Sequence, residues 1–238
     1  MRCVVDKKRF GVGLLGLLTF LVVLAFWLFP VLNHKTGLEW ADELFNQLAK
    51  NSMSFMPAAT RRAARFEGVI VDLGVNPRWP GGDVRIAQIV EGNGMSARVV
   101  GDGRVRIVSD LGLLAKAAAQ DADLLFKGQE QDLRNRYGMS GKEVVYFWWT
   151  AFDGLIRRYV QENRPAEADF ARFMTTRVLE PSYNFAGIQS KDISKNVGIV
   201  VFLLGFYIVY TLWLGFSIMF LFEGIGIRAT KPAEKREA

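Results

Sequence analysis

The sequence predicts a membrane protein in which two transmembrane α-helices, one N-terminal and one C-terminal, flank an α+β extracytoplasmic domain with a small antiparallel β insert. Two uncharged runs, residues 10–32 and 197–222, carry this prediction. About 20 apolar helical residues cross the hydrocarbon core of a bilayer, so each run is long enough for one span. Between the runs, the spacing of apolar residues switches between helical and strand-like, which is typical of an α+β domain.

Residues 1–9 form the predicted cytoplasmic N-terminus. They contain four basic residues and one acidic residue, and basic residues collect on the cytoplasmic side of a membrane. The following run, 10–32, ends in bulky residues around Trp27 and Pro30. Because a signal peptidase requires small residues at its cleavage site, we expect an uncleaved signal anchor here.

Gly13 and Gly16 lie inside the first run, and small residues let membrane helices approach one another closely. We therefore predict that they serve helix packing in the membrane. Together with Gly11 they match the Gly-x-Gly-x-x-Gly dinucleotide fingerprint. That motif needs a preceding strand and a βαβ unit, so the match inside a membrane span is accidental.

Residues 33–196 form the predicted periplasmic domain. Residues 36–66 show helical spacing, with a possible break near Pro57. Residues 67–110 are β-rich, and we expect three or four strands within the segments 68–74, 83–92 and 97–112. Glycines on both sides of Asp102 predict a tight hairpin in the last segment, because glycine adopts positive φ at low steric cost.

Residues 111–180 return to helical spacing. One helix is expected over 111–136, and the glycines at 138 and 141 end it. Ser140 and Glu143 have the spacing of a capping box, which predicts a second helix running toward Asn163. A third, shorter helix is expected between Pro165 and Pro181.

Residues 197–222 are long enough to cross the membrane once with some tilt, but too short to cross it twice. Residues 223–238 form the predicted cytoplasmic tail, which carries four basic residues. Basic residues outside both spans place both termini in the cytoplasm and the domain in the periplasm. The predicted location is the bacterial inner membrane.

The charge of the chain does not indicate nucleic-acid binding. The net charge is +6, but the segment between the spans contains 22 basic and 20 acidic residues, so the excess lies beside the membrane. Cys3 is the only cysteine, which excludes an internal disulfide and a thiolate metal cluster. His34 is the only histidine, and alone it makes a poor metal site; its alternative role is as one axial ligand to a haem shared with a partner.

No catalytic, cofactor-binding or metal-binding residues are predicted. Acidic residues are spread over the β-rich part, where two meeting in a cleft would allow acid–base chemistry. Turns and strand ends are also common places for aspartate, and this structural role is the favoured interpretation. The residues concerned are Asp72, Asp83, Asp102 and Asp110.

The most unusual segment, residues 144–159, places an aromatic-rich apolar stretch before two arginines. Three interpretations stay open: a helix lying on the membrane surface, a buried core helix, and an anchor for a partner protein, since tryptophan and arginine dominate interface hot spots. The predicted partner or membrane interface consists of Trp148, Trp149, Phe152, Arg157 and Arg158.

Within this segment Asp153-Gly-Leu-Ile-Arg157-Arg158 resembles an Asp-Gly-Leu-Val-x-Arg segment of an inner-membrane protein family of integrating conjugative elements. The stretch Gly37-Leu-Glu-Trp-Ala-Asp-Glu-Leu is also similar. The resemblance implies an accessory membrane component of a conjugative transfer apparatus, with no catalytic residues to carry over. Members of that family usually have more spans, and residues 67–110 have no counterpart in it.

The sequence therefore predicts a non-enzymatic, membrane-anchored accessory subunit of a multiprotein envelope complex, of the conjugative or type IV secretion kind. Its expected partners are other membrane or periplasmic proteins in a hetero-oligomer, and the lipid bilayer. The alternative is a small accessory subunit of a membrane-bound oxidoreductase complex. An enzyme with its own active site has the least support.

Overall fold

The computed structural model describes residues 4–30 and 34–227, and the chain divides into two compact units. One unit comprises residues 1–51 and 190–238, and the other comprises residues 52–189. The predicted cytoplasmic tail and the basic flanks at residues 2 and 228–236 lie wholly or partly outside the described residues. We describe each unit separately.

The first unit contains two long apolar helices, α1 (Lys7–Leu28) and α10 (Ile193–Gly224). By length and composition, both are able to cross a membrane. Only 11% and 6% of their most apolar windows are buried, whereas the core helix of a water-soluble protein would be mostly covered. The basic residues Lys7, Lys8 and Arg9 form the first turn of α1, and the carboxylate of its N-cap, Asp6, accepts hydrogen bonds from Lys8 N and Arg9 N at 3.0 Å.

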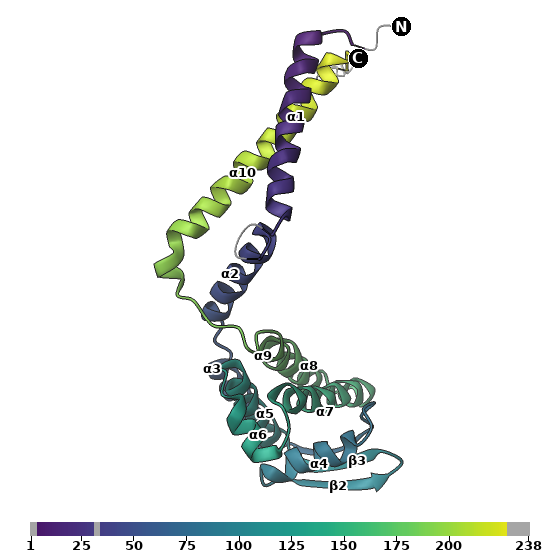
Figure 1. The fold of residues 1–238 in the computed structure, drawn as a ribbon. Helices are drawn as coiled ribbons and strands as arrows, with labels where there is room; N and C mark the ends of the chain where they lie inside the picture. Colours follow the sequence, from purple (N-terminus) through teal and green to yellow (C-terminus); the bar gives the residue numbers. More distant parts are fainter. Residues whose placement is uncertain (1–3, 31–33, 228–238) are drawn as a thin grey trace, which may run out of the picture. The chain divides into compact units, whose positions relative to one another are not determined.

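Helices α1 and α10 pack against each other where α1 carries its glycines (Figure 1). A Cβ on Gly13 would lie 2.6 Å from Leu221 N, and one on Gly16 would lie 2.5 Å from Ser217 Oγ. The Trp213 indole donates a 3.1 Å hydrogen bond to Gly16 O. Both glycines thus lie where the predicted packing role requires them, because any side chain there would push the helices apart.

A third helix, α2 (Gly37–Ser52), also belongs to this unit. Its residues Leu44 and Leu48 are buried together with Leu203 of α10. The chain enters α2 at Gly37, where a side chain would clash with the indole of Trp27. The predicted helix over 36–66 is therefore two helices, of which the first packs on the apolar pair and the second begins the globular unit.

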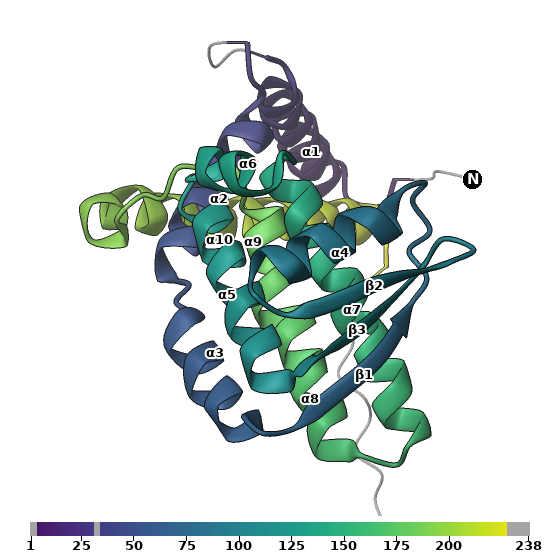
Figure 2. The ribbon, with the colours of Figure 1, turned by 90° about the horizontal axis from the view of Figure 1, so that it is seen from below.

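The second unit contains one antiparallel sheet and a layer of helices on one of its faces (Figures 1 and 2). The strands have the order β1-β3-β2, and β1 pairs with β3 from Ile70↔Asp110 to Val75↔Val105. The elements, in chain order, are α3 (Met56–Ala63), a 3-10 turn (Ala64–Phe66), β1 (Ile70–Val75), α4 (Gly82–Gly92), β2 (Ser96–Gly101), β3 (Arg104–Asp110), α5 (Leu111–Phe126), α6 (Glu130–Tyr137), α7 (Gly141–Gln161), α8 (Pro165–Met174), a π-helical turn (Thr175–Leu179) and α9 (Glu180–Asn184).

The strands alternate in the way that one covered face requires. Val71, Leu73, Val105 and Ile107 are buried under the helices. The residues between them point to the opposite face, which none of the described residues of this unit covers. That outer face carries Ile70, Asp72, Arg98, Arg104, Arg106 and Val108.

The predicted strand over 83–92 is wrong, because this segment forms helix α4. Ile86, Ile89 and Val90 are buried on one side at spacings of three and four, which is a helical period, while Val84 is exposed. The density of β-branched residues is strand-like, but their periodicity is not. The sheet consequently has three strands among the described residues.

Of the other local predictions in this unit, the hairpin is confirmed, the helix over 111–136 is divided, and the helix end at Pro181 is wrong. The hairpin joins β2 to β3, with Gly101, Asp102 and Gly103 all at positive φ. The helix expected over 111–136 is divided into α5 and α6 by a turn in which Gly128 has φ 79°. Pro181 does not end a helix as predicted: α8, the π-helical turn Thr175–Leu179 and α9 follow one another without a break, and Pro181 is the second residue of α9.

We predict that Gly13→Leu destabilises the packing of α1 on α10. The new side chain has no room beside Leu221 and Ser217, and overpacking of this kind typically costs about 1–3 kcal/mol. The melting temperature of the full chain in mild detergent, followed by tryptophan fluorescence, should fall. Gly11→Leu is the matched control, since no atom lies within 4 Å of the Cβ it would add. Equal melting temperatures for the two variants would contradict the prediction.

Candidate partner-binding surface on helix α7

Helix α7 contains all five residues of the predicted interface and lies at the centre of the globular unit. Ser140 begins it with a complete capping box: Glu143 N donates to Ser140 Oγ, and Ser140 N donates to Glu143 Oε2 at 2.9 Å. The hydrogen bond from the Ser140 backbone is the main cause of a lowered pKa of Glu143, to which the ion pair with Arg85 adds. The predicted cap is thus confirmed, and the helix that follows has three distinct sides.

The first side of α7 is buried, and this corrects part of the predicted interface. Trp148 and Phe152 are 1% and 0% exposed, so neither side chain is available to a partner or to a membrane. They belong to the single large core of this unit. The strongly apolar character of both side chains explains the burial, and the core interpretation holds for them.

The buried indole of Trp148 donates a 2.8 Å hydrogen bond to Asp121 Oδ2. The same oxygen accepts a 2.9 Å bond from the Tyr137 hydroxyl, and Asp121 Oδ1 lies 3.1 Å from Arg136. Asp121 is itself fully buried. A buried carboxylate needs such partners, because an unpaired charge in a protein interior is very unfavourable. The cluster therefore joins α5, α6 and α7.

Burial raises the pKa of Asp121 above its ordinary value, although the hydrogen bonds from Trp148 and Tyr137 and the charge of Arg136 act in the opposite direction. Burial also raises the pKa of Tyr137 to about 12, and the neighbouring carboxylate adds to this shift. The tyrosine hydroxyl consequently keeps its proton and acts as a donor at physiological pH.

We predict that Asp121 lowers the stability of the protein as the pH rises above about 4. The unfolded chain releases this proton near the ordinary pKa of aspartate, whereas the folded chain holds it to higher pH, so stability falls between the two. Asp121→Asn removes the titration but keeps an acceptor for Trp148. Urea unfolding of the full chain in detergent is followed by tryptophan fluorescence at several pH values from 4 to 7. The free energy of unfolding of the variant, relative to that of the wild type, should increase as the pH rises.

The exposed residue Asp169 provides the matched control for this experiment. Asp169→Asn removes one carboxylate without touching the buried cluster. If the free-energy difference between wild type and Asp121→Asn is the same at every pH, the proposed linkage is wrong.

The second side of α7 borders a hollow of about 450 Å³, which we call the aromatic hollow. The Trp149 indole donates a 3.1 Å hydrogen bond to Glu180 Oε1 across it. Tyr183 is 40% exposed, and the Lys142 ammonium lies 5.1 Å from the centre of its ring. The residues that line the hollow are Val145, Tyr146, Trp149, Leu179, Glu180, Tyr183 and Asn184.

An exposed tryptophan outside the hollow extends this surface. Trp79 is 50% exposed, and its ring centre lies 6.1 Å from that of Tyr146. Large aromatic side chains that keep a polar tip and remain accessible are typical of protein interfaces. Of the three predicted aromatic residues of the interface, Trp149 alone lies on this accessible surface.

The third side of α7 faces strand β1 across a hollow of about 430 Å³, which we call the strand–helix groove. Arg157 and Arg158 both line it, as do Thr150, Gly154 and Gln161, which recur at the helical period. The strand contributes Leu73, Gly74, Val75 and Asn76. The structure therefore brings the two predicted arginines together, but on a different side of the helix from Trp149.

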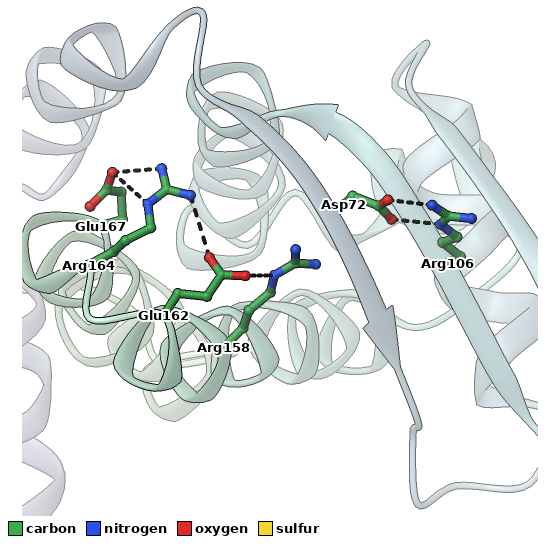
Figure 3. A network of polar contacts seen from close by, with 6 residues as sticks. All are labelled: Asp72, Arg106, Arg158, Glu162, Arg164 and Glu167. Carbon is green, nitrogen blue, oxygen red and sulfur yellow. Dashed lines mark hydrogen bonds and ion pairs between the residues drawn. The ribbon is translucent and has the colours of Figure 1, made fainter.

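Both arginines make ion pairs along the helix. Arg157 lies 2.7 Å from Asp153, and Arg158 lies 2.6 Å from Glu162. Figure 3 shows the second pair continuing to Arg164 and Glu167, and it shows Arg158 extending from the helix toward the strand that carries Asp72. Isolated exposed pairs of this kind contribute little to stability, roughly 0.3–0.5 kcal/mol each for an i,i+4 pair.

The remaining acidic residues from the sequence do not form a common cleft. Asp72 is held by Arg106 on the outer face of the sheet, and this hydrogen bond is the main cause of its lowered pKa. Asp102 lies in the hairpin turn, and Asp110 caps α5 through Leu113 N at 2.8 Å. Asp83 lies in the first turn of α4. In residues 4–30 and 34–227 no group of three or more potential ligands could hold a metal ion.

Sequence reasoning did not find the acidic and aromatic partners that complete these sites. Asp121 lies among alanines and gives no signal of its own, since its role depends on Trp148 from a distant helix. Glu180 and Tyr183 lie outside residues 144–159, where the interface was predicted. The π-helical turn before α9 is what aims them, and it has no clear sequence pattern.

Comparison with protein-family models, with curated proteins and with solved structures gives no match for this chain. The resemblance of residues 153–158 to the conjugative-element family therefore stays a prediction.

Proposed function

We propose that this chain is a non-enzymatic, membrane-anchored accessory subunit of a multiprotein envelope complex. The observation that carries the proposal is the aromatic hollow, in which Trp149 and Tyr183 remain accessible beside the buried core of the unit. Tryptophan and tyrosine are the residues that most often dominate binding energy at protein interfaces. The two apolar helices supply the anchor, since few of their side chains are covered by the protein itself.

The same proposal includes the topology. Both termini lie in the cytoplasm, α1 and α10 cross the bacterial inner membrane, and residues 52–189 lie in the periplasm. The basic residues outside both apolar runs support this orientation. The resemblance of residues 153–158 favours a conjugative or type IV secretion apparatus as the complex.

The topology predicts a definite labelling pattern in cells. In a Cys3→Ser background, Thr176→Cys places a thiol on an exposed position of the globular unit, and a maleimide that does not cross the inner membrane should label it in intact cells. Ala238→Cys should be labelled only after the cells are permeabilised. The reverse pattern, or equal labelling of both positions, would exclude the proposed orientation.

Because the aromatic hollow is the proposed partner interface, truncating its aromatic side chains should reduce the amount of complex that is recovered. Combined replacement by Trp149→Ala and Tyr183→Ala should lower recovery of co-purifying proteins in mild detergent by roughly thirtyfold, because hot-spot truncation costs about 2 kcal/mol or more. Quantitative mass spectrometry after affinity purification measures the recovery.

Leu113→Ala is the control for this experiment, because it truncates an apolar side chain that is 53% exposed on α5, outside the hollow. Membrane fractionation shows whether each variant is still inserted. Full recovery of partners with the double variant would count against the proposed function.

One observation favours the alternative, an accessory subunit of a membrane-bound oxidoreductase. The membrane unit has an apolar hollow of about 460 Å³ whose lining includes Trp27, Tyr207 and Tyr210. A hollow of this size and character would suit a quinone ring or a lipid chain. The absorption spectrum of the purified complex distinguishes the two functions, since only the oxidoreductase subunit should co-purify with a quinone or haem signal.

A further inference from the structure

Strand β1 forms a free edge of the sheet. Among the described residues, the strand order β1-β3-β2 leaves β1 paired with β3 on one side only. Leu111 N donates to Val69 O at 2.8 Å in the same register that pairs Val71 with Ser109 and Leu73 with Ile107. Because hydrogen-bonded and non-hydrogen-bonded pairs alternate in an antiparallel ladder, the odd-numbered residues of β1 bond to β3. The even-numbered residues therefore direct their N–H and C=O groups away from the sheet.

The two edges of the sheet differ in how well they are protected. On β2, the register shifts between Val99 and Gly101, and such an irregularity disturbs the ladder and discourages further pairing. On β1, the register runs without a shift from Ile70 to Val75. The strand also lacks the lysine or proline that commonly blunts an exposed edge. Strand β1 is therefore the edge that is able to accept another strand.

The strand–helix groove runs beside this edge. Gly74 lines the groove, and a Cβ placed on it would meet no atom within 4 Å, so the outer face of the sheet is open beside this residue. On the opposite wall, a Cβ on Gly154 would lie 3.5 Å from Leu73, so α7 approaches the strand closely there. On either side of Gly154, the residues of α7 that line the groove have larger side chains, namely Thr150, Arg157, Arg158 and Gln161.

The charge of the groove favours an acidic occupant. Arg157 and Arg158 are its charged lining residues, and their side chains are 65% and 40% exposed. Their ion-pair partners are Asp153 of α7 and Glu162, which caps the same helix, in partly exposed pairs that water screens; Arg158 also interacts electrostatically with Asp72 of β1. A carboxylate on a ligand can therefore replace these partners, and arginine binds carboxylates in a bidentate manner that also fixes orientation.

We propose that the strand–helix groove binds an extended acidic peptide segment of a partner protein. The segment adds a fourth strand to the sheet along β1, and its backbone exchanges hydrogen bonds with the outward groups of Asp72 and Gly74. Carboxylates near one end of the segment pair with Arg157 and Arg158. Backbone pairing gives such binding its affinity, and side-chain pockets give it specificity. The proposal deepens the proposed function, since it names the chemistry of one partner contact.

The experiment begins with the purified full chain in lipid nanodiscs and a phage-displayed library of random nonapeptides. Selected sequences should be enriched in aspartate and glutamate, and the best one is synthesised for titration. A selected set without acidic enrichment would overturn the proposal.

Titration of the synthetic peptide then tests the geometry. Gly74→Pro removes one outward N–H while leaving the bonds to β3 in place, since proline is tolerated in an edge strand at such a position. This variant should weaken peptide binding at least tenfold. Arg157→Gln combined with Arg158→Gln should weaken it at least tenfold as well, whereas Arg98→Gln, on the outer face of β2, should leave it unchanged.

A second measurement does not depend on how well Gly74→Pro folds. The selected peptide is resynthesised with alternate backbone nitrogens methylated, in both possible phases, and titrated against the wild-type chain. Methylation in the phase that faces β1 should abolish binding, and methylation in the other phase should leave it within about twofold. Equal binding by both methylated peptides would overturn strand addition.

Two further outcomes separate this proposal from the others. If the chain self-associates and Gly74→Pro abolishes the association, β1 is a contact between copies of the chain, and the proposal is wrong. If peptide binding follows the expected pattern while partner recovery is unaffected by the Trp149 and Tyr183 replacements, the groove is supported and the proposed role of the aromatic hollow fails.

Discussion

The hydrogen bond between the Trp148 indole and the buried Asp121 carboxylate fixes helix α7, on which both exposed hollows of the globular unit depend. A helix with apolar residues on several sides can rotate to bury any of them, and aromatic residues alone do not choose one orientation. The buried carboxylate of Asp121 selects one orientation of the helix, because it requires hydrogen-bond donors and Trp148 and Tyr137 supply them. With that side buried, Trp149 and the two arginines are left at the surface.

The two units of the chain satisfy different physical constraints. In the globular unit, a continuous core is buried beneath one face of the sheet, and exposed ion pairs occupy the surface. In the apolar helices, burial by protein is slight, and close contact comes instead from Gly13 and Gly16. Aromatic contacts add to this packing, as between Phe20 and Tyr210, whose ring centres lie 4.2 Å apart. The globular unit is thus held by a buried core, whereas α1 and α10 are held by close backbone contact and aromatic stacking.

Local signals in the sequence predicted much of the fold. The apolar runs, the Ser140–Glu143 cap and the glycine-rich hairpin each depend on neighbouring residues, and the structure has all three. The strand predicted over 83–92 is wrong. This segment has the β-branched residues of a strand, but Ile86, Ile89 and Val90 are buried at a helical period and the segment forms a helix. The prediction placed Trp148 in an interface because tryptophan is frequent at interface hot spots, and the partner that buries it, Asp121, is distant in the sequence. The division of α7 into three sides depends on such distant contacts and was beyond prediction.

The π-helical turn at Thr175–Leu179 also determines where two residues of the aromatic hollow lie. Helices α8 and α9 run through it without a break. A π turn holds one more residue than an α turn, and one residue corresponds to about 100° of rotation around a helix. Removing a single residue there would turn Glu180 and Tyr183 away from Trp149. The position of Glu180 and Tyr183 beside Trp149 therefore depends on the one extra residue that this turn contains.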